Sequence, residues 1–217
     1  ISLPLEFSYM FMLMRYTGMR RSEANSITTA VVIKPTPEQL SKGYLTVTIG
    51  PRFGIMTKNS KEREIEIPSA LMNNLYQYSI SARYIKRRDK FITKAEEKSP
   101  IPLFLNNRGG SFSATTVNGR WGEIRNALAL RIGQAFDHKV HNLRSTYAVE
   151  RLKALLNAGM QQGDALSFIQ SKLGHSDLTT TLHYLKQAEG RDEAFKWAEV
   201  ALDHLFNIDG SDFEVAQ

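Results

Sequence analysis

The chain has 217 residues, of which 42% are hydrophobic and 23% charged, so it can bury one sizeable core. It contains no cysteine, which excludes disulfide bonds, thiolate metal sites and a cysteine nucleophile. Its apolar runs are too short to span a bilayer and no signal peptide opens it, so we expect a soluble protein. The net charge of +6 favours a polyanionic partner, although many basic proteins bind none.

Apolar residues at helical spacing predict a buried helix over residues 5–16, which Gly18 ends. Arg20 follows directly after this helix, where a surface arginine has no need to be. It could form a helix-terminal salt bridge with Glu23, or it could bind an anion while that carboxylate orients it. The two interpretations are compatible.

Three stretches rich in β-branched residues, 44–49, 53–57 and 62–67, predict a small antiparallel sheet. Lys58 would lie at the tip of the last hairpin, where most lysines merely solvate a turn. A helix over residues 69–88 should follow the sheet.

Basic residues crowd the C-terminal end of that predicted helix and the loop expected over 89–102. They are Arg83, Lys86, Arg87, Arg88, Lys90, Lys94 and Lys98. We interpret the first five as candidates for phosphate contact. A solvated helix face would explain the cluster equally well, so both interpretations stay open.

The second half of the chain is predicted to be helical. Helices are expected over about 113–132, 141–158, 163–173 and 191–205. The fold class is therefore mainly α with a small antiparallel β-sheet.

Two short polar motifs fall at the ends of these helices. His141 and Arg144 stand three apart on a starting helix and share one face. Gly174 ends the next helix, and a short helix after it would carry His175 and Tyr184 to one cleft. Alternatively, Tyr184 is an ordinary core residue and His175 a capping loop residue.

Together these polar residues could perform phosphoryl transfer. Arg20 and Arg144 could clamp the oxygens of a phosphodiester and neutralise the charge of its transition state without a metal. Tyr184, with an ordinary pKa near 10, would need a base and a positive field, which His141 and the arginines could supply. Lys58 is a candidate acid for the leaving sugar oxygen. The expected intermediate is a phosphotyrosine ester, so rejoining needs no ATP. We expect neither a metal nor another cofactor.

The sequence closely resembles the tyrosine recombinase (phage integrase) family. The matching pieces are Thr17-Gly18-Met19-Arg20 with Glu23, the hairpin Thr57-Lys58, His141-x-x-Arg144, Leu173-Gly174-His175 and Tyr184, in the family's order. The resemblance implies a mostly helical catalytic domain with a small sheet at one edge.

By this resemblance, Arg20 and Arg144 would bind the scissile phosphate of double-stranded DNA. Tyr184 would attack that phosphate to give a 3′-phosphotyrosyl link. His175 would donate a hydrogen bond to the phosphate, and Glu23 would orient Arg20 from behind.

The resemblance also makes Lys58 the general acid, with Lys61 as the substitute because hairpin alignments slip. His141 would be the assisting base. We interpret His183 and Tyr147 as structural.

The chain departs from the family pattern in two respects. Members usually carry an N-terminal helical domain that closes a clamp around DNA, and we expect it to be absent here, together with the first catalytic helix. The basic stretch 83–102 could be an insertion with its own DNA contacts. We expect a catalytic domain over residues 1–205 and an acidic tail over 206–217 that packs on a neighbouring protomer.

The favoured function is a site-specific recombinase or integrase of a mobile element. It would act as a homotetramer on DNA in the full-length protein, with accessory DNA-bending or directionality proteins, in the bacterial cytoplasm and on the nucleoid. The alternatives are a type IB topoisomerase, which nicks one strand, and a DNA-binding protein that kept the fold and lost catalysis. Every expected catalytic position is filled, which disfavours the last alternative.

Overall fold

The computed structural model describes residues 3–96 and 99–175. Its helices are α1 (Leu5–Thr17), α2 (Arg21–Asn25), α3 (Pro37–Lys42), α4 (Ser69–Ser79), α5 (Ala82–Ile92), α6 (Ala114–Ile132), α7 (Asn142–Asn157) and α8 (Gln162–Leu173). The strands are β1 (Tyr44–Ile49) and β2 (Arg63–Pro68). Tyr184, His183, Lys98, the predicted helix over 191–205 and the acidic tail lie outside the described residues.

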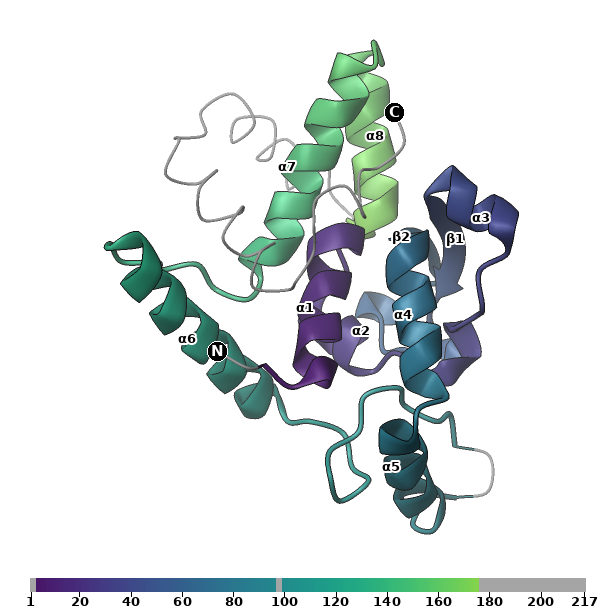
Figure 1. The fold of residues 1–217 in the computed structure, drawn as a ribbon. Coiled ribbons are helices and arrows are strands. Elements are labelled where there is room, and N and C mark those ends of the chain that lie inside the picture. The colour runs from purple at the N-terminus through teal and green to yellow at the C-terminus, as the bar shows by residue number, and fades with distance from the viewer. Residues whose placement is uncertain (1–2, 97–98, 176–217) are drawn as a thin grey trace.

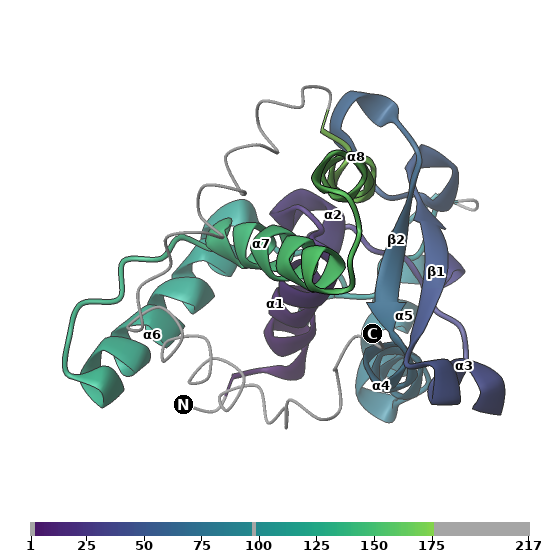
Figure 2. The same cartoon turned by 90° about the horizontal axis from the view of Figure 1, so that it is seen from above.

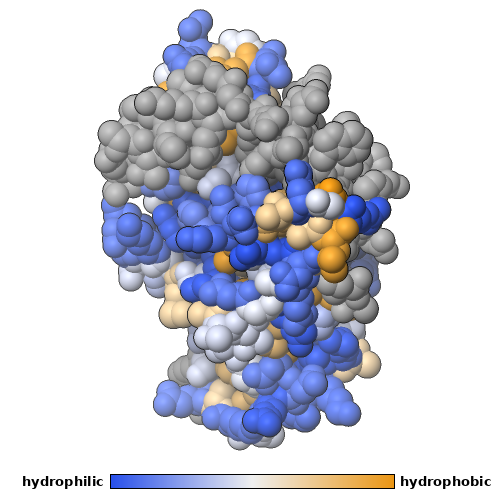
Figure 3. All heavy atoms as spheres, turned by 90° about the vertical axis from the view of Figure 1, so that its left-hand side faces the viewer, coloured by the Kyte–Doolittle hydropathy of each residue, from blue (hydrophilic) through white to orange (hydrophobic). Residues whose placement is uncertain are grey.

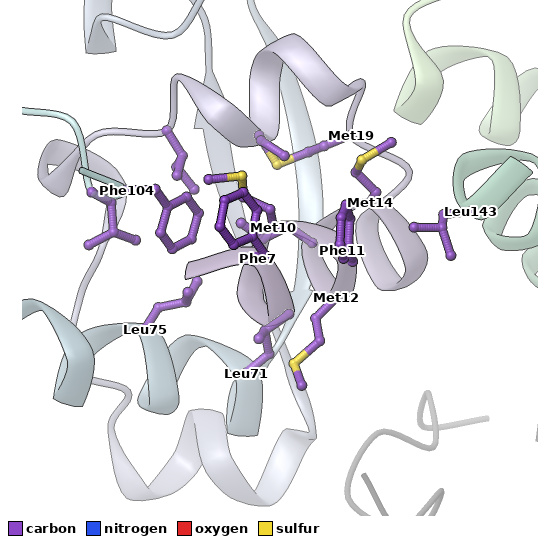
Figure 4. Close-up of a cluster of buried hydrophobic side chains, with 14 of the residues drawn as sticks. Phe7, Met10, Phe11, Met12, Met14, Met19, Leu71, Leu75, Phe104 and Leu143 are labelled. Atoms are coloured by element: carbon purple, nitrogen blue, oxygen red, sulfur yellow. The ribbon is translucent and has the colours of Figure 1, made fainter. Parts of the chain in front are cut away.

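Helix α1 forms the centre of the described structure (Figures 1 and 2). It is apolar on almost every side, and such a helix is stable only when neighbours cover it all round. Phe11 is fully buried, and Figure 4 shows side chains from α4, such as Leu71, on one side of the helix and Leu143 from α7 on another. Each such side chain contributes about 1.5–3 kcal/mol when it leaves water.

The two strands pair antiparallel, with Leu45 opposite Ile67 and Ile49 opposite Arg63. Alternate residues of a strand share one face, and here Leu45, Ile65 and Ile67 are buried on the face toward the core. The sheet lies at one edge of the described structure and α6 at the other (Figures 1 and 2). The predicted fold class, mainly α with a small antiparallel sheet, is confirmed.

The prediction of a third strand over 53–57 was wrong. Pro51 lacks the N–H that a strand ladder needs, and Pro51–Phe53 forms a 3₁₀ turn instead. Gly54 then adopts a φ of 73°, where an added Cβ would lie 2.3 Å from the side chain of Pro100. Only Ile55 of this stretch is fully buried, so it contributes to the core without pairing.

The predicted helix over 69–88 is divided into α4 and α5. The hydroxyl of Ser81 accepts a hydrogen bond of 3.2 Å from the backbone N–H of Tyr84, which makes Ser81 the N-cap of a new helix. Helix α5 then runs to Ile92, so the loop predicted from residue 89 begins later. A capping serine inside a helical pattern was the sequence signal for this break.

The surface on the α6 side of the molecule is mostly hydrophilic, with small apolar patches between the polar side chains (Figure 3). Among the described residues, no helix has both the length and the apolar character needed to cross a membrane.

Candidate active site

A cleft of about 490 Å³ opens where the start of α2, the start of α7, the end of α8 and the chain before β2 meet. It is lined by five of the six predicted catalytic residues, namely Arg20, Lys58, His141, Arg144 and His175. The sixth, Tyr184, lies outside the described residues. Side chains that are up to 155 positions apart in the sequence therefore share one surface.

The C-terminal end of α8 forms one wall of this cleft. Three consecutive carbonyls there each accept a hydrogen bond from a different arginine. The pairs are Lys172 with Arg63 at 2.9 Å, Leu173 with Arg144 at 2.6 Å and Gly174 with Arg20 at 3.2 Å. The last carbonyls of a helix have no intrahelical partner and carry the negative end of its dipole, so cations stabilise them. This helix end therefore gathers three guanidinium groups at one point.

Arg144 is the most deeply buried of the three, with 1% of its surface exposed. Besides Leu173, its guanidinium donates to the carbonyl of Gly18 at the end of α1. Gly18 has a φ of 68°, and an added Cβ would lie 2.5 Å from the ring of Tyr147. Gly18, two residues before Arg20, is thus required both by the backbone turn and by the close approach of α7.

Tyr147 was interpreted as structural. It is buried, with 6% of its surface exposed, and it belongs to the apolar cluster between α7 and α8. Burial raises the pKa of its hydroxyl far above the usual range. A phenol in this environment resists ionisation, which is unfavourable for a nucleophile.

Glu23 lies behind the cleft with its side chain fully buried. Its carboxylate accepts hydrogen bonds from the backbone N–H of Arg20 at 2.7 Å and from the Arg20 guanidinium at 2.9 Å. The predicted salt bridge is therefore present. It leaves the Arg20 guanidinium at the cleft wall, where 21% of the side chain is exposed.

Arg63 is a residue of this site that the sequence analysis missed. Its two terminal nitrogens donate to the two oxygens of Glu23 at 2.8 and 2.6 Å, in a bidentate pair. A signal for it existed in the alternation of β2, because Arg63 is in phase with the buried residues Ile65 and Ile67. An arginine at the buried phase of a strand needs a buried partner.

The two histidines of the cleft are both held toward the neutral form. Partial removal of water, followed by the positive charges of Arg144 and Arg20, lowers the pKa of His141. The same causes, with Arg63 and His141 added, lower the pKa of His175 to about 4. At neutral pH a neutral imidazole can accept a proton at one nitrogen and donate a hydrogen bond from the other.

Lys58 is exposed and begins the 3₁₀ turn Lys58–Ser60 in the connection between β1 and β2. Asn59 and Ser60 both adopt positive φ in this turn, at 59° and 52°. Lys61 also lines the cleft, so both lysines remain candidates for the general acid.

The five candidates for phosphate contact lie on α5, and two of them bind a buried carboxylate of α1. Arg83 donates to Glu6 at 2.7 and 2.9 Å, and Arg87 binds Glu6 and also the carbonyl of Leu105 at 2.7 Å. Glu6 lies on α1 and is 1% exposed. Arg83 and Arg87 thus fasten α5 to the central helix, which the sequence analysis did not foresee.

The other three candidates for phosphate contact lie at the surface of α5. Lys86 is exposed, Arg88 pairs with Asp89 at 3.0 Å, and the ammonium of Lys90 donates to the carbonyl of Asn107 at 2.9 Å. DNA contact by these residues stays a prediction. Within residues 3–96 and 99–175, no group of three acidic, histidine or cysteine side chains could hold a metal ion.

The chain thus folds into a mainly helical domain with a small antiparallel sheet, and its cleft brings together two arginines, two histidines and Lys58. Residues 2–191 match the phage integrase family, and the chain belongs to this family.

Among its relatives, the tyrosine recombinase XerD of Rickettsia prowazekii is 28% identical over 181 residues, which cover 83% of this chain and 50% of that protein. The tyrosine recombinase XerC of Syntrophus aciditrophicus is 30% identical over 130 residues, which cover 60% of this chain and 37% of that protein. The chain spans about half the length, or less, of the curated relatives it matches.

Solved structures share the fold. The site-specific recombinase XerH, bound to its palindromic difH substrate after cleavage, superposes with a TM-score of 0.57 at 18% identity, over 85% of this chain and 44% of that one. The Tn1549 transposon integrase in complex with transposon right end DNA gives a TM-score of 0.54 at 20% identity, over 91% of this chain and 58% of that one.

Proposed function

We propose that this chain is the catalytic domain of a site-specific DNA recombinase that cleaves and rejoins strands through a 3′-phosphotyrosyl intermediate. The observation that carries the proposal is the cleft lined by Arg20, Lys58, His141, Arg144 and His175. The motifs of the sequence, together with their resemblance to the phage integrase family, predicted each of these side chains. Their convergence from separate elements is what a shared chemical task requires.

The first task is to bind the scissile phosphate. Arg20 and Arg144 bring two fixed positive charges to the cleft, and Arg144 does so from an almost fully buried position. Such charges attract a phosphate more strongly in a site with little water than in solution, because less solvent screens them. Losing one preorganised donor to a transition-state oxygen typically costs about 3–4 kcal/mol in barrier height.

The second task is proton transfer. The Tyr184 oxygen attacks the phosphorus, and its proton passes to the neutral ring of His141. The bond from phosphorus to the 5′ oxygen of the leaving strand breaks, and that oxygen takes a proton from Lys58, with Lys61 as the substitute. The lowered pKa of His141 keeps the imidazole unprotonated and ready to accept.

Tyr184 follows His175, the last residue that the structure describes, by nine positions. An extended chain of that length spans at most roughly 30 Å. The tyrosine is therefore within covalent reach of the cleft. His175 would donate a hydrogen bond to the phosphate while the tyrosine attacks.

The substrate we propose is double-stranded DNA at a recombination site of a mobile element, in the bacterial cytoplasm. A homotetramer on DNA and accessory bending or directionality proteins belong to the same proposal. The XerH and Tn1549 integrase structures are complexes with DNA, which supports DNA as the ligand. Relatives named as recombinases favour recombination over the topoisomerase and over a protein without catalysis.

The test uses a pool of nicked duplexes with random sequence, from which the short cleaved piece diffuses away. The wild-type chain and the Tyr184→Phe variant are incubated with this pool in EDTA and without ATP. A denaturant-resistant protein–DNA adduct that only the wild type forms is the expected result, and sequencing the captured DNA gives the preferred site. Absence of any adduct from the wild type would refute the enzymatic proposal.

A further inference from the structure

All three nitrogens of the Arg63 guanidinium donate hydrogen bonds at the wall of the cleft. Two of them bind both oxygens of Glu23, and Nε donates to the carbonyl of Lys172 at 2.9 Å. The side chain is 9% exposed. We propose that Arg63 is a positioning residue, which holds Glu23 so that the carboxylate orients Arg20 toward the phosphate. This role rests on the proposed function.

The contact geometry explains why Glu23 alone would not suffice. Glu23 is fully buried, and Arg20 reaches it through its backbone N–H at 2.7 Å and one guanidinium nitrogen at 2.9 Å. Arg63 engages both oxygens with two nitrogens of one rigid planar group. Such a bidentate pair fixes the plane of the carboxylate, and the oxygen that binds the Arg20 guanidinium is therefore held in place by Arg63.

The electrostatics agree with the geometry. Burial by itself would raise the pKa of Glu23, but the hydrogen bonds and charge of Arg63, and then those of Arg20, bring it below its usual value. Of the two arginines, Arg63 lowers the pKa of Glu23 more than Arg20 does. It thus keeps a buried carboxylate ionised beside Arg20.

Arg63 also joins this carboxylate to the end of α8. Gly174 has a φ of 62°, and an added Cβ there would lie 3.0 Å from Cδ of Arg63, so the stem of the arginine packs directly on this turn. The Gly174 carbonyl in turn accepts from Arg20 at 3.2 Å. Arg63 therefore supports Arg20 from two sides, through Glu23 and through the helix end that precedes His175.

Lysine cannot reproduce this arrangement. Arg63 uses three nitrogens of one planar group to bind two partners, Glu23 and the carbonyl of Lys172, whereas lysine offers a single ammonium. Arg63→Lys keeps the charge and removes the fork. Arg151→Lys is the matched control, since Arg151 is 15% exposed and pairs with Glu66 of β2 at 3.1 Å, away from the cleft lining.

The first measurement is single-turnover cleavage of the duplex selected from the random pool. We expect Arg63→Lys to slow cleavage by about 10- to 100-fold, as supporting residues around a site typically do, with DNA affinity changed by less than about threefold. Arg151→Lys should cleave at the wild-type rate. Adding Glu23→Gln to Arg63→Lys should slow the reaction far less than the product of the two single effects, because both act through Arg20. Equal rates for Arg63→Lys and the control, or multiplicative losses, would contradict this role.

The second measurement needs no DNA. Nitrogen NMR relaxation reports the motion of the Arg20 Nε–H group in the folded chain, with folding of each variant checked by its unfolding midpoint. We expect this group to be ordered in the wild type and in Arg151→Lys, and mobile in Arg63→Lys. Unchanged order in Arg63→Lys would overturn the inference. Failure of the wild type to cleave any DNA would instead count against the proposed function and leave this readout decisive for Arg63.

Discussion

The guanidinium of Arg144 donates a hydrogen bond of 2.6 Å to the carbonyl of Leu173, which lies 29 residues further along the chain. The same group binds the carbonyl of Gly18, so one buried cation joins the ends of α1 and α8 to the first turn of α7. The residue that we propose for phosphate binding is thus also a junction of the fold. A substitution of Arg144 therefore changes both the packing of the fold and the charge of the cleft.

Replacing Arg144 should therefore lower stability as well as activity. Arg144→Met removes two charge-assisted hydrogen bonds and leaves buried carbonyls unpaired, which should cost about 3 kcal/mol in the free energy of unfolding. Urea unfolding measures this. The control is Arg120→Met, which breaks an exposed pair with Glu123 and should cost less than about 0.5 kcal/mol. Equal stabilities for the two variants would contradict the junction.

Gly18 offers a test of close packing between α1 and α7. Gly18→Ala places a methyl group 2.5 Å from the Tyr147 ring in a backbone turn that disfavours side chains. Gly133→Ala has nearly the same φ, 70° against 68°, with nothing within 4 Å of the new Cβ. Both variants carry the backbone cost of about 1 kcal/mol, and only Gly18→Ala adds an overpacking cost of about 1–3 kcal/mol. Equal unfolding midpoints for Gly18→Ala and Gly133→Ala would show that α1 and α7 can move apart without cost.

Stability should rise with pH between about 4 and 6.5, because the unfolded chain binds a proton at His175 in this range and the folded chain does not. The stabilisation is fully present above the unfolded pKa and is lost as the pH falls toward the folded value of about 4. His175→Asn should flatten this part of the profile. Urea midpoints measured across the range check it, and an identical slope in the variant would exclude His175 as the cause.

Two substitutions distinguish the exposed basic residue Lys86 of α5 from Arg87, which is buried on the same helix. Lys86→Gln should leave stability unchanged and, if Lys86 contacts a phosphate, reduce the slope of log affinity against log salt by about 0.9. Arg87→Gln should instead lower stability, since Arg87 is buried against Glu6. Binding titrations of the selected duplex at several salt concentrations decide the first point. An unchanged slope for Lys86→Gln would assign Lys86 to a solvated helix face.

Much of the fold could be predicted because its elements carry strong local patterns. The apolar periodicity of α1 and the alternation of β1 and β2 identified them directly. Short motifs at helix ends located four of the five cleft residues, and the predicted hairpin located Lys58. The rest depends on long-range partners that no local pattern contains. Arg63 meets Glu23 across 40 positions, and Arg87 meets Glu6 across 81. Such ion pairs become visible only when the packing of the whole chain is known.

The measurement that tests the central claim most directly is peptide mapping of the covalent adduct by mass spectrometry. The captured complex is digested with protease and nuclease, and the modified peptide is sequenced. We predict a nucleotide attached through its 3′ phosphate to the hydroxyl of Tyr184. Attachment at Tyr147, Tyr16 or any other residue, or attachment through a 5′ phosphate, would contradict the mechanism.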